Sequence, residues 1–370
     1  MAVTALQAHG EDLGAAAVGE YLGATTALHY GDAQAEAAAL REGCGVHDLG
    51  FREKISLTGG DRVRWLNGMV TNNIRDLAVD HGVYAYLLNP QGHILGDLYA
   101  YNLGDSIVVD TDKAQVEKIL ATFDHYLIMD DVEIKNLADE ITAIGISGPR
   151  SREVLHKADV DFPELKGLQL HTIECDCDCG CLNCTVVRSD NPSGDAYEIW
   201  LAPAYVKPLW DALVKAGATP VGAEALEMQR IASGIPRYGV DIRERDLPQE
   251  TEQARALNFN KGCYIGQEIV ERIRSRGAVH RKFSGFLADS PLTPGTKIVV
   301  AEKEVGEITS ATSLRLANHE RNIALGYIRR EIGTPGREVR IGTAAAKVVA
   351  LPLTGSTLLD NDTSLAQHPA

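Results

Sequence analysis

The chain has 370 residues, and at about 150 residues per domain this length predicts two or three domains. Apolar residues make up 45% of it and charged residues 24%, as in ordinary globular proteins, while the formal charge of −15 makes nucleic-acid binding through bulk charge an unlikely class of function. No apolar run reaches the roughly 18 residues that cross a bilayer, and the first forty residues fit neither a secretory signal nor a transit peptide. We therefore expect a cytoplasmic protein without a membrane span.

The first part of the chain predicts a mixture of helices and strands. Residues 1–24 are rich in Ala and Gly and weakly patterned, so we expect a loose N-terminus there. Asp32 and Gly43 are suited to cap the two ends of a helix. Apolar periodicity and turn residues then predict further helices through Trp65 and over 113–123, and strands near 54–58, 84–88, 98–103, 106–110 and 132–136.

A strand–turn–helix pattern occurs twice. Thr58-Gly59 stands seven residues before Leu66, and Ser147-Gly148 stands seven residues before Leu155, in the second case between a strand over 142–147 and a helix over 149–157. This register predicts an α+β region with an internal duplication, although chance similarity is an alternative. We place this region at residues 25–275.

Strand-like segments dominate after residue 275. They are short and separated by Gly and Pro, which is typical of a small β-barrel. The expected strands are 281–288, 297–300, 305–311, 322–328, 337–341 and 347–351. We therefore assign residues 276–353 to a C-terminal β-barrel domain and expect a disordered tail over 354–370.

The most unusual short segment is residues 261–268. Phosphate-loop, dinucleotide-binding and zincin motifs are absent from the sequence, whereas this segment places a cysteine between two glycines just before a predicted helix. A neighbouring lysine and a helix start both favour the thiolate of such a cysteine. The alternative is a buried small residue beside a turn. The motif reads Lys261, Gly262, Cys263, Tyr264, Ile265, Gly266, Gln267 and Glu268.

This octapeptide resembles the signature of the YgfZ-type folate-binding proteins, which are related to the glycine-cleavage T-protein, an aminomethyltransferase. The resemblance extends over roughly residues 25–353. Further segments that are similar to the family lie at residues 41–49, 70–73, 88–97, 197–199, 230–241, 305–310 and 323–327.

The resemblance implies a fold and a site. The fold is the T-protein-like ring of three modules around tetrahydrofolate, with the duplicated α/β folate-binding region and the C-terminal β-barrel. Glu198 takes the position of the pterin-binding glutamate, where one carboxylate can accept two adjacent N–H groups. Asp97 takes the position of the T-protein's catalytic aspartate. Tyr84 is a candidate to stack on the folate rings, and Arg230 matches an arginine of the same region of the family.

Three departures distinguish this sequence from the T-proteins. Gly96 replaces the first aspartate of an Asp-Asp pair, Leu226 stands where the T-protein has an arginine in its folate pocket, and Cys263 replaces an acidic residue. These departures favour the YgfZ-like branch. That branch implies folate-dependent support of iron–sulfur cluster assembly or repair, with tRNA-modifying iron–sulfur enzymes as clients. The alternative is a folate-dependent aminomethyltransferase of the glycine cleavage system, so whether the chain is an enzyme stays open here.

Two further clusters stand outside this pattern. Soft thiolates can hold zinc, copper(I) or an iron–sulfur cluster, but the close alternating spacing differs from that of paired zinc ligands, and cysteines without a metal are the stronger expectation. The cysteines are Cys175, Cys177, Cys179, Cys181 and Cys184. A basic cluster after the motif could meet a folate polyglutamate tail or RNA phosphates, or could be a solvated helix face. Its members are Arg272, Arg274, Arg276, His280, Arg281 and Lys282.

Overall fold

The computed structural model describes residues 2–173, 183–192, 194–277, 279–316 and 319–353. The chain divides into two compact units and passes between them several times. Unit 1 comprises Met1–Gln91, Leu95–Leu226 and Arg255–Gln267, and unit 2 comprises Gly92–Ile94, Glu227–Ala254 and Glu268–Ala370. None of the helices in these described ranges is both long and apolar enough to cross a membrane. The 354–370 tail predicted from the sequence lies outside the described residues.

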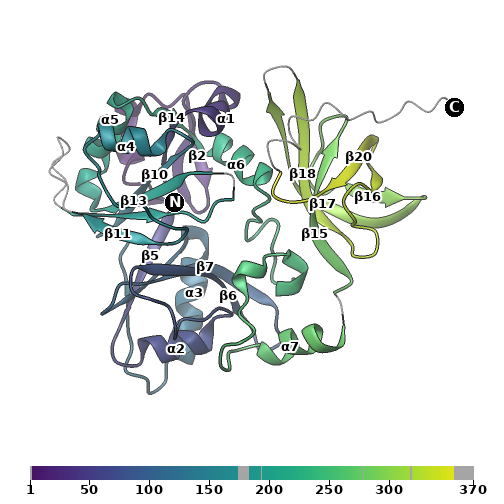
Figure 1. The fold of residues 1–370 in the computed structure, drawn as a ribbon, viewed down its shortest axis with the longest axis horizontal. Helices are drawn as coiled ribbons and strands as arrows, with labels where there is room; N and C mark the ends of the chain where they lie inside the picture. The colour runs from purple at the N-terminus through teal and green to yellow at the C-terminus, as the bar shows by residue number, and fades with distance from the viewer. Residues whose placement is uncertain (1, 174–182, 193, 278, 317–318, 354–370) are drawn as a thin grey trace. The chain divides into compact units, whose positions relative to one another are not determined.

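Helices cover the sheets of unit 1 and join it to unit 2 (Figure 1). The α-helices are α1 (Ala33–Glu42), α2 (Arg62–Met69), α3 (Lys113–Tyr126), α4 (Ser151–Lys157), α5 (Val206–Lys215), α6 (Ala223–Ala232) and α7 (Gln267–Arg276). The 3-10 helices are η1 (Gln7–Leu13), η2 (Pro203–Tyr205), η3 (Pro248–Thr251) and η4 (Ala254–Ala256).

Unit 1 contains three sheets. A three-stranded sheet has the order β1 (Ala2–Val3), β3 (Ala24–His29), β2 (Ala17–Tyr21). A five-stranded sheet has the order β6 (His81–Leu88), β7 (Ile94–Asn102), β8 (Ile107–Asp112), β5 (Arg52–Thr58), β9 (Glu133–Asn136). A six-stranded sheet has the order β11 (Leu170–Ile173), β12 (Cys184–Arg188), β13 (Ala196–Leu201), β10 (Thr142–Ser147), β4 (Gly45–Asp48), β14 (Thr219–Val221).

The expected duplication appears as one strand–turn–helix unit in each large sheet. β5 leads to α2 and β10 leads to α4, and both turns depend on glycine. Gly59 has φ of 95° and Gly148 has φ of 121°, a backbone conformation that side chains rarely adopt. A Cβ would lie 2.2 Å from the Asp131 carbonyl oxygen in the first case and 2.5 Å from that of Gly43 in the second. Helix α4 starts at Ser151, two residues later than predicted, because the chain must first complete this turn.

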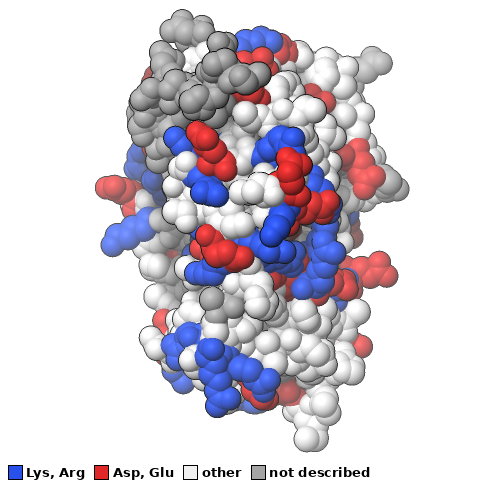
Figure 2. Space-filling view, turned by 90° about the vertical axis from the view of Figure 1, so that its right-hand side faces the viewer, with Lys and Arg blue, Asp and Glu red and all other residues white. Residues whose placement is uncertain are grey.

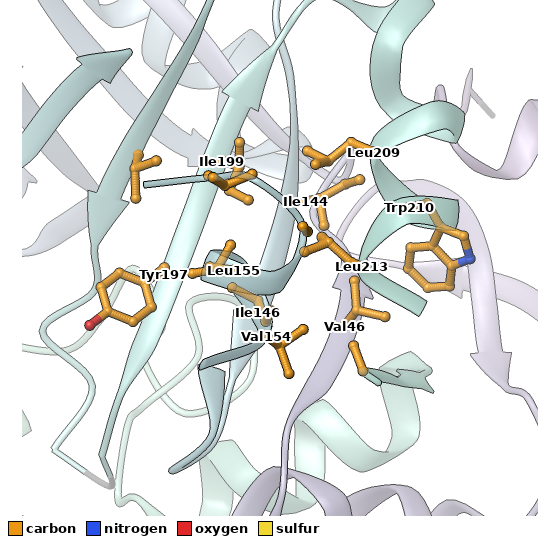
Figure 3. Packing of buried hydrophobic residues seen from close by; sticks show 14 of the residues in the cluster. Val46, Ile144, Ile146, Val154, Leu155, Tyr197, Ile199, Leu209, Trp210 and Leu213 are labelled. Atoms are coloured by element: carbon orange, nitrogen blue, oxygen red, sulfur yellow. The ribbon is translucent and has the colours of Figure 1, made fainter. Parts of the chain in front are cut away.

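Apolar side chains fill the space between each of the two large sheets and the helices that pack on it. Helices α4 and α5 pack on one face of the six-stranded sheet, where Leu155 and Trp210 belong to the same buried apolar cluster as Ile146 (Figure 3). Helices α2 and α3 pack on the five-stranded sheet through Leu66 and Phe123, which are fully buried. Each of the two large sheets therefore has an apolar core on its helix-covered face.

The N-terminal segment is ordered, in contrast to the loose segment predicted for residues 1–24. Strand β1 pairs parallel with β3, and β2 pairs antiparallel with it. Leu6 and Leu13 are buried in the core of the six-stranded sheet, and Thr4 donates a hydrogen bond to the buried Asp48. A few well-placed apolar residues anchor this segment, and its weak periodicity hid them.

Unit 2 contains the predicted barrel. Six antiparallel strands close it in the order β15 (Arg281–Ala288), β18 (Glu320–Arg329), β17 (Lys303–Arg315), β16 (Lys297–Val300), β19 (Glu338–Ile341), β20 (Ala344–Val349). All six were predicted from the sequence, and the limits of β15 and β16 agree to the residue. Its interior is apolar, with Phe286 and Ile298 fully buried.

Candidate functional site

A row of polar side chains crosses three strands of the five-stranded sheet. Tyr99 of β7 lies opposite Asp110 of β8, and Asp110 lies opposite Lys54 of β5. Cross-strand partners share one face of a sheet, and Arg52, two residues before Lys54, lies on that face as well. The register alone therefore gathers two cations, a carboxylate and a phenol.

Arg52, Lys54 and Asp110 form a buried charge cluster. The Arg52 guanidinium donates to Asp110 at 3.0 and 2.8 Å, and Lys54 Nζ lies 3.2 Å from the same carboxylate. Arg52 also donates to Asp112 at 2.9 Å. Burial opposes ionisation of Asp110, but the two cations outweigh it and hold the pKa of Asp110 below its ordinary value. The cluster thus keeps a charged carboxylate in the interior.

Glu198 of β13 completes this cluster from the six-stranded sheet. Trp200 Nε1 donates to Glu198 Oε2 at 3.1 Å, and Lys54 Nζ lies 5.2 Å from the centre of the Trp200 ring. Burial and the charge of Asp110 raise the pKa of Glu198, while Lys54 and Arg52 act in the opposite direction. Glu198 remains partly exposed, and its Oε1 accepts no hydrogen bond from the described residues. A carboxylate in this state can accept N–H groups from a ligand.

His47 lies in the same cross-strand row as Glu198. Gly145 of β10 pairs with Glu198 on one side and with His47 of β4 on the other. A Cβ at Gly145 would lie 2.0 Å from His47 Nε2, so the imidazole occupies the space above this glycine. Burial lowers the pKa of His47 to about 4, and the ring is therefore neutral at physiological pH. A neutral imidazole thus covers the strand next to Glu198.

Asp97 is held by hydrogen bonds from two directions. The Tyr84 hydroxyl donates to Oδ2 at 2.6 Å, and Gln115 Nε2 of α3 donates to Oδ1 at 2.7 Å. The backbone N–H of Asp97 donates in turn to Gln115 Oε1 at 3.0 Å. Asp97 lies two residues before Tyr99 on β7, on the face that carries the charged row. Asp97 therefore lies on the sheet face that also carries Arg52, Lys54 and Asp110.

Tyr84 makes different contacts from those expected of a folate-stacking residue. Its ring is 4% exposed, and the Arg255 guanidinium lies 4.3 Å from the ring centre. Arg255 is fixed by an ion pair with Asp190, whose second oxygen accepts a hydrogen bond from Tyr99 at 3.3 Å. The Arg255 guanidinium therefore covers one face of the Tyr84 ring, and the Tyr84 hydroxyl holds Asp97.

Arg230, predicted as a folate contact, has its hydrogen bonds within unit 2. Its five N–H groups match five hydrogen bonds, to Glu227 at 3.0 and 2.5 Å, Asp241 at 2.7 Å, Ser310 at 2.8 Å and the Ile235 carbonyl at 2.6 Å. Arginine has five N–H donors, so none is left for a ligand. These contacts give Arg230 a structural role.

The motif 261–268 lies against the segment that follows α2. Lys261 Nζ donates to the carbonyl oxygens of Asn67, Val70 and Asn72 at 2.6, 2.5 and 2.7 Å. Burial lowers the pKa of Lys261 to about 7, whereas three carbonyl acceptors favour the charged ammonium. The sequence predicts that the charge of Lys261 favours the Cys263 thiolate. In the structure the Lys261 ammonium binds three carbonyl oxygens and anchors the loop. Cys263, two residues later, is exposed.

The rest of the motif extends this attachment. The N–H of Ile265 donates to the Gly68 carbonyl at 3.1 Å, and the N–H of Asn258 donates to the Thr71 carbonyl at 3.1 Å. Tyr264 is buried, and Lys261 Nζ lies 4.9 Å from its ring centre. Gly262 is exposed and Gly266 has φ of 81°, while Gln267 and Glu268 form the first turn of α7, as predicted. Two motifs almost two hundred residues apart in sequence therefore form one structure.

The two remaining clusters give little support for a metal or polyanion site. Cys175, Cys177, Cys179 and Cys181 lie outside the described residues, and Cys184 begins β12. Within the described ranges, no group of three His, Cys, Asp or Glu side chains is placed to hold a metal. Several of the clustered basic side chains have acidic partners, namely Arg272 with Glu268, Arg274 with Glu271 and Arg281 with Glu250. Basic and acidic side chains are interspersed over the middle of the face shown in Figure 2, and basic side chains gather at its lower end.

Sequence reasoning missed the residues that surround Asp97 and Glu198. Arg52, Glu53 and Lys54 are three consecutive charged residues at and just before the predicted strand near 54–58, so their pattern does not mark one charged face. Nothing in the sequence signals Gln115 or Arg255, because a single polar residue in a helix or a loop is ordinarily exposed. Their roles depend on tertiary contacts.

Comparison with known proteins agrees with this fold. The GCVT N-terminal domain family matches residues 6–261, and the glycine cleavage T-protein C-terminal barrel domain family matches residues 281–358. Proteins named aminomethyltransferase are 26% identical over 314 residues in a Thermoanaerobacter species (83% of this chain and 84% of that protein) and 28% identical over 338 residues in Rubrobacter xylanophilus (90% and 89%).

Two further relatives come from other settings. A putative chloroplastic transferase of Arabidopsis thaliana is 26% identical over 320 residues, which is 84% of this chain and 71% of that protein. The crystal structure of the glycine cleavage system aminomethyltransferase T from Bartonella henselae superimposes with a TM-score of 0.83 at 21% identity, covering 93% of this chain and 95% of the other. The predicted α+β fold with its C-terminal barrel is thus confirmed, and the chain belongs to the glycine cleavage T-protein family.

Proposed function

We propose that this protein binds tetrahydrofolate and transfers a one-carbon unit on it, as a folate-dependent transferase of the aminomethyltransferase kind. The observation that carries the proposal is Glu198, a recessed carboxylate with one oxygen that accepts no hydrogen bond from the described residues. The charge of Arg52 acts on Glu198, and the firmly held Asp97 lies on the same sheet face as Arg52. The names of the relatives and the family membership support the same reaction class. They favour this reading over the YgfZ-like one.

The chemistry of the pterin suits Glu198. A pterin presents a ring N–H beside an amino group, and a carboxylate can accept both. Oε1 is open, and Oε2 accepts only the Trp200 donor from the described residues, so both oxygens have lone pairs available. Trp200 donates to one side of this carboxylate, and His47 lies beyond Gly145 in the same cross-strand row. Glu198 binds and orients the pterin in this proposal.

Asp97 would serve the transfer itself. Bound tetrahydrofolate supplies the nitrogen atoms that receive the one-carbon unit. Each Asp97 oxygen accepts one hydrogen bond, from Tyr84 or from Gln115, and keeps a lone pair for a proton or for a cationic group. Asp97 therefore holds a proton, or a positive charge, close to the reacting nitrogen. General acid–base assistance of this kind contributes about 10² to 10⁴ in rate.

Calorimetry tests the binding part of the proposal. Glu198→Ala is expected to weaken tetrahydrofolate binding more than tenfold, because losing a partner of a desolvated charged hydrogen bond costs about 2–5 kcal/mol. Glu117→Ala is the matched control, since Glu117 is an exposed glutamate in the same unit. Equal affinities of the Glu198→Ala variant and the wild type would refute the pterin assignment.

A reconstituted glycine-cleavage assay tests the reaction. The wild type is expected to release ammonia in a folate- and lipoyl-dependent manner, and Asp97→Asn is expected to lose about 10²-fold or more of that rate while still binding folate. Folate binding by a wild type that releases no ammonia would contradict the transferase and favour the second candidate.

The second candidate is folate-dependent support of iron–sulfur proteins through Cys263. It is favoured by one observation, an exposed thiol on a loop that Lys261 fixes with three hydrogen bonds. Cys263→Ser should then lower the activity of iron–sulfur client enzymes in cells without lowering the amount of the protein. Cys263 should also alkylate faster than Cys44, whose burial raises its pKa to about 11. Full client activity with the serine variant would remove this candidate.

A further inference from the structure

We propose that Gln115 is the positioning residue of Asp97, and that a side chain at Gly96 would crowd the Gln115 amide that makes these contacts. The inference rests on the proposed function only in giving Asp97 a role in the transfer. The contacts themselves are independent of any ligand.

Gln115 binds one residue with both ends of its side-chain amide. It is 4% exposed and lies in the first turn of α3, with Oε1 accepting the Asp97 backbone N–H at 3.0 Å and Nε2 donating to Asp97 Oδ1 at 2.7 Å. The backbone N–H can only donate, so it identifies the acceptor end of the amide and leaves the donor end for the carboxylate. The two hydrogen bonds therefore fix both the strand and the carboxylate of Asp97 relative to α3.

The second oxygen of Asp97 is fixed from another strand. The Tyr84 hydroxyl of β6 donates to Oδ2 at 2.6 Å. With one donor on each oxygen, from α3 and from β6, rotation of the carboxylate about its own axis breaks two hydrogen bonds at once. Positioning residues act in this way, because a reacting group that is misplaced by a fraction of an ångström loses rate.

Gly96 leaves the space that this contact uses. A Cβ at Gly96 would lie 3.1 Å from Gln115 Oε1 and 3.6 Å from Ile119 Cγ1. The first distance is tighter than an ordinary contact, so an alanine at this position would displace the amide by a few tenths of an ångström. Gly96 and Gln115 thus form a pair in which one residue makes room for the other.

We call the two hydrogen bonds between Gln115 and Asp97 the clamp. Hydrogen exchange of the Asp97 amide tests the clamp in the absence of folate. Gln115→Leu removes both hydrogen bonds, and exchange of the Asp97 N–H should become about tenfold faster, since that N–H loses its acceptor. Gln34→Leu on α1 is the control and should leave it unchanged. Gln115→Glu keeps an acceptor for the N–H, so protection should be retained. Unchanged exchange in Gln115→Leu, with folding verified by circular dichroism, would overturn the clamp.

Transfer kinetics test the consequence. In Gln115→Leu and Gln115→Glu, kcat should fall about tenfold or more while KM and Kd for tetrahydrofolate change less than twofold, because Glu198 binds the pterin. The glutamate variant is decisive, since it retains the backbone contact and loses only the donor to Oδ1. Wild-type kcat in that variant would overturn the positioning role. A wild type without activity would refute the proposed function instead, and the exchange experiment would still decide the clamp.

A double-mutant cycle tests the part played by Gly96. Gly96→Ala should lower kcat in the wild-type background and have less than a twofold effect in the Gln115→Ala background, where the crowded atom is absent. Equal effects of Gly96→Ala in both backgrounds would show that the two residues act independently and would overturn the pairing.

Discussion

The two units bury charged clusters of different kinds. In unit 2, Asp241 accepts hydrogen bonds from Arg230, Thr309, Ser310 and the Arg237 backbone, and it is completely buried. In unit 1, the Arg52, Lys54 and Asp110 cluster ends at Glu198, which keeps an oxygen without a hydrogen bond from the described residues. A closed network of charges stabilises a fold, whereas an open one retains capacity for a ligand. The number of satisfied hydrogen-bonding groups therefore distinguishes Arg230, which has a structural role, from Glu198, which is a candidate to bind a ligand.

Asp241→Ala should give the largest loss of stability. It removes the completely buried carboxylate of the two that pair with Arg230, and removing one partner of a buried ion pair typically costs about 3–5 kcal/mol of unfolding free energy. Chemical denaturation followed by circular dichroism measures this loss. Asp211→Ala is the control, because the Asp211 side chain is 59% exposed and, among the described residues, pairs only with Lys207 on its own helix. A loss no larger than that of the control would remove the distinction between the two clusters.

Lys261→Met should have the next largest effect. Three buried carbonyl oxygens lose a charged donor, and we expect a loss of about 3 kcal/mol. The same variant should make the loop around Cys263 more susceptible to proteolysis, whereas Lys166→Met, at an exposed lysine of unit 1, should not. Unaltered stability would mean that the loop is held by other contacts.

Tyr84→Phe should produce a smaller change. It removes one hydrogen bond to the Asp97 carboxylate, worth about 1.5–3 kcal/mol when the acceptor is charged, and leaves the ring and its Arg255 contact in place. We expect a several-fold lower kcat with little change in folate affinity. Tyr205→Phe is a suitable control from the same unit. A strongly reduced affinity would favour the direct folate contact that the sequence predicts for Tyr84.

Glu198→Gln should have the smallest effect on stability, and its sign should depend on pH. Burial and Asp110 raise the pKa of Glu198, so the folded state binds the proton more tightly than the unfolded state does. The ionised side chain therefore lowers stability above its folded-state pKa. The glutamine variant should be more stable than the wild type near pH 8, and the difference should vanish near about pH 3, where both states are protonated. A variant less stable at pH 8 would contradict the open character of this cluster.

The sequence predicted the fold better than the site. Short-range signals were sufficient to predict α1 and the barrel strands. In α1, the Asp32 side chain caps the helix by accepting the backbone N–H of Gln34, and Gly43 ends it. The roles of Gln115 and Arg255 depend on strands and helices far apart in the chain, so no local pattern carried them. The roles predicted for Asp97 and Glu198 came from family resemblance and stay predictions until the experiments above are done.

The order of the two units along the chain bears on how the protein is made. Unit 1 is interrupted after Leu226 and regains its last segment, Arg255–Gln267, only after a part of unit 2. A ribosome adding about 5–20 residues per second needs several seconds to bridge that interval. During this time the carbonyl groups of Asn67, Val70 and Asn72 lack the Lys261 ammonium. The nascent N-terminal region thus exposes three carbonyl groups that have not yet met their donor. A truncation at Leu226 should therefore be a substrate for chaperones and not a stable fragment.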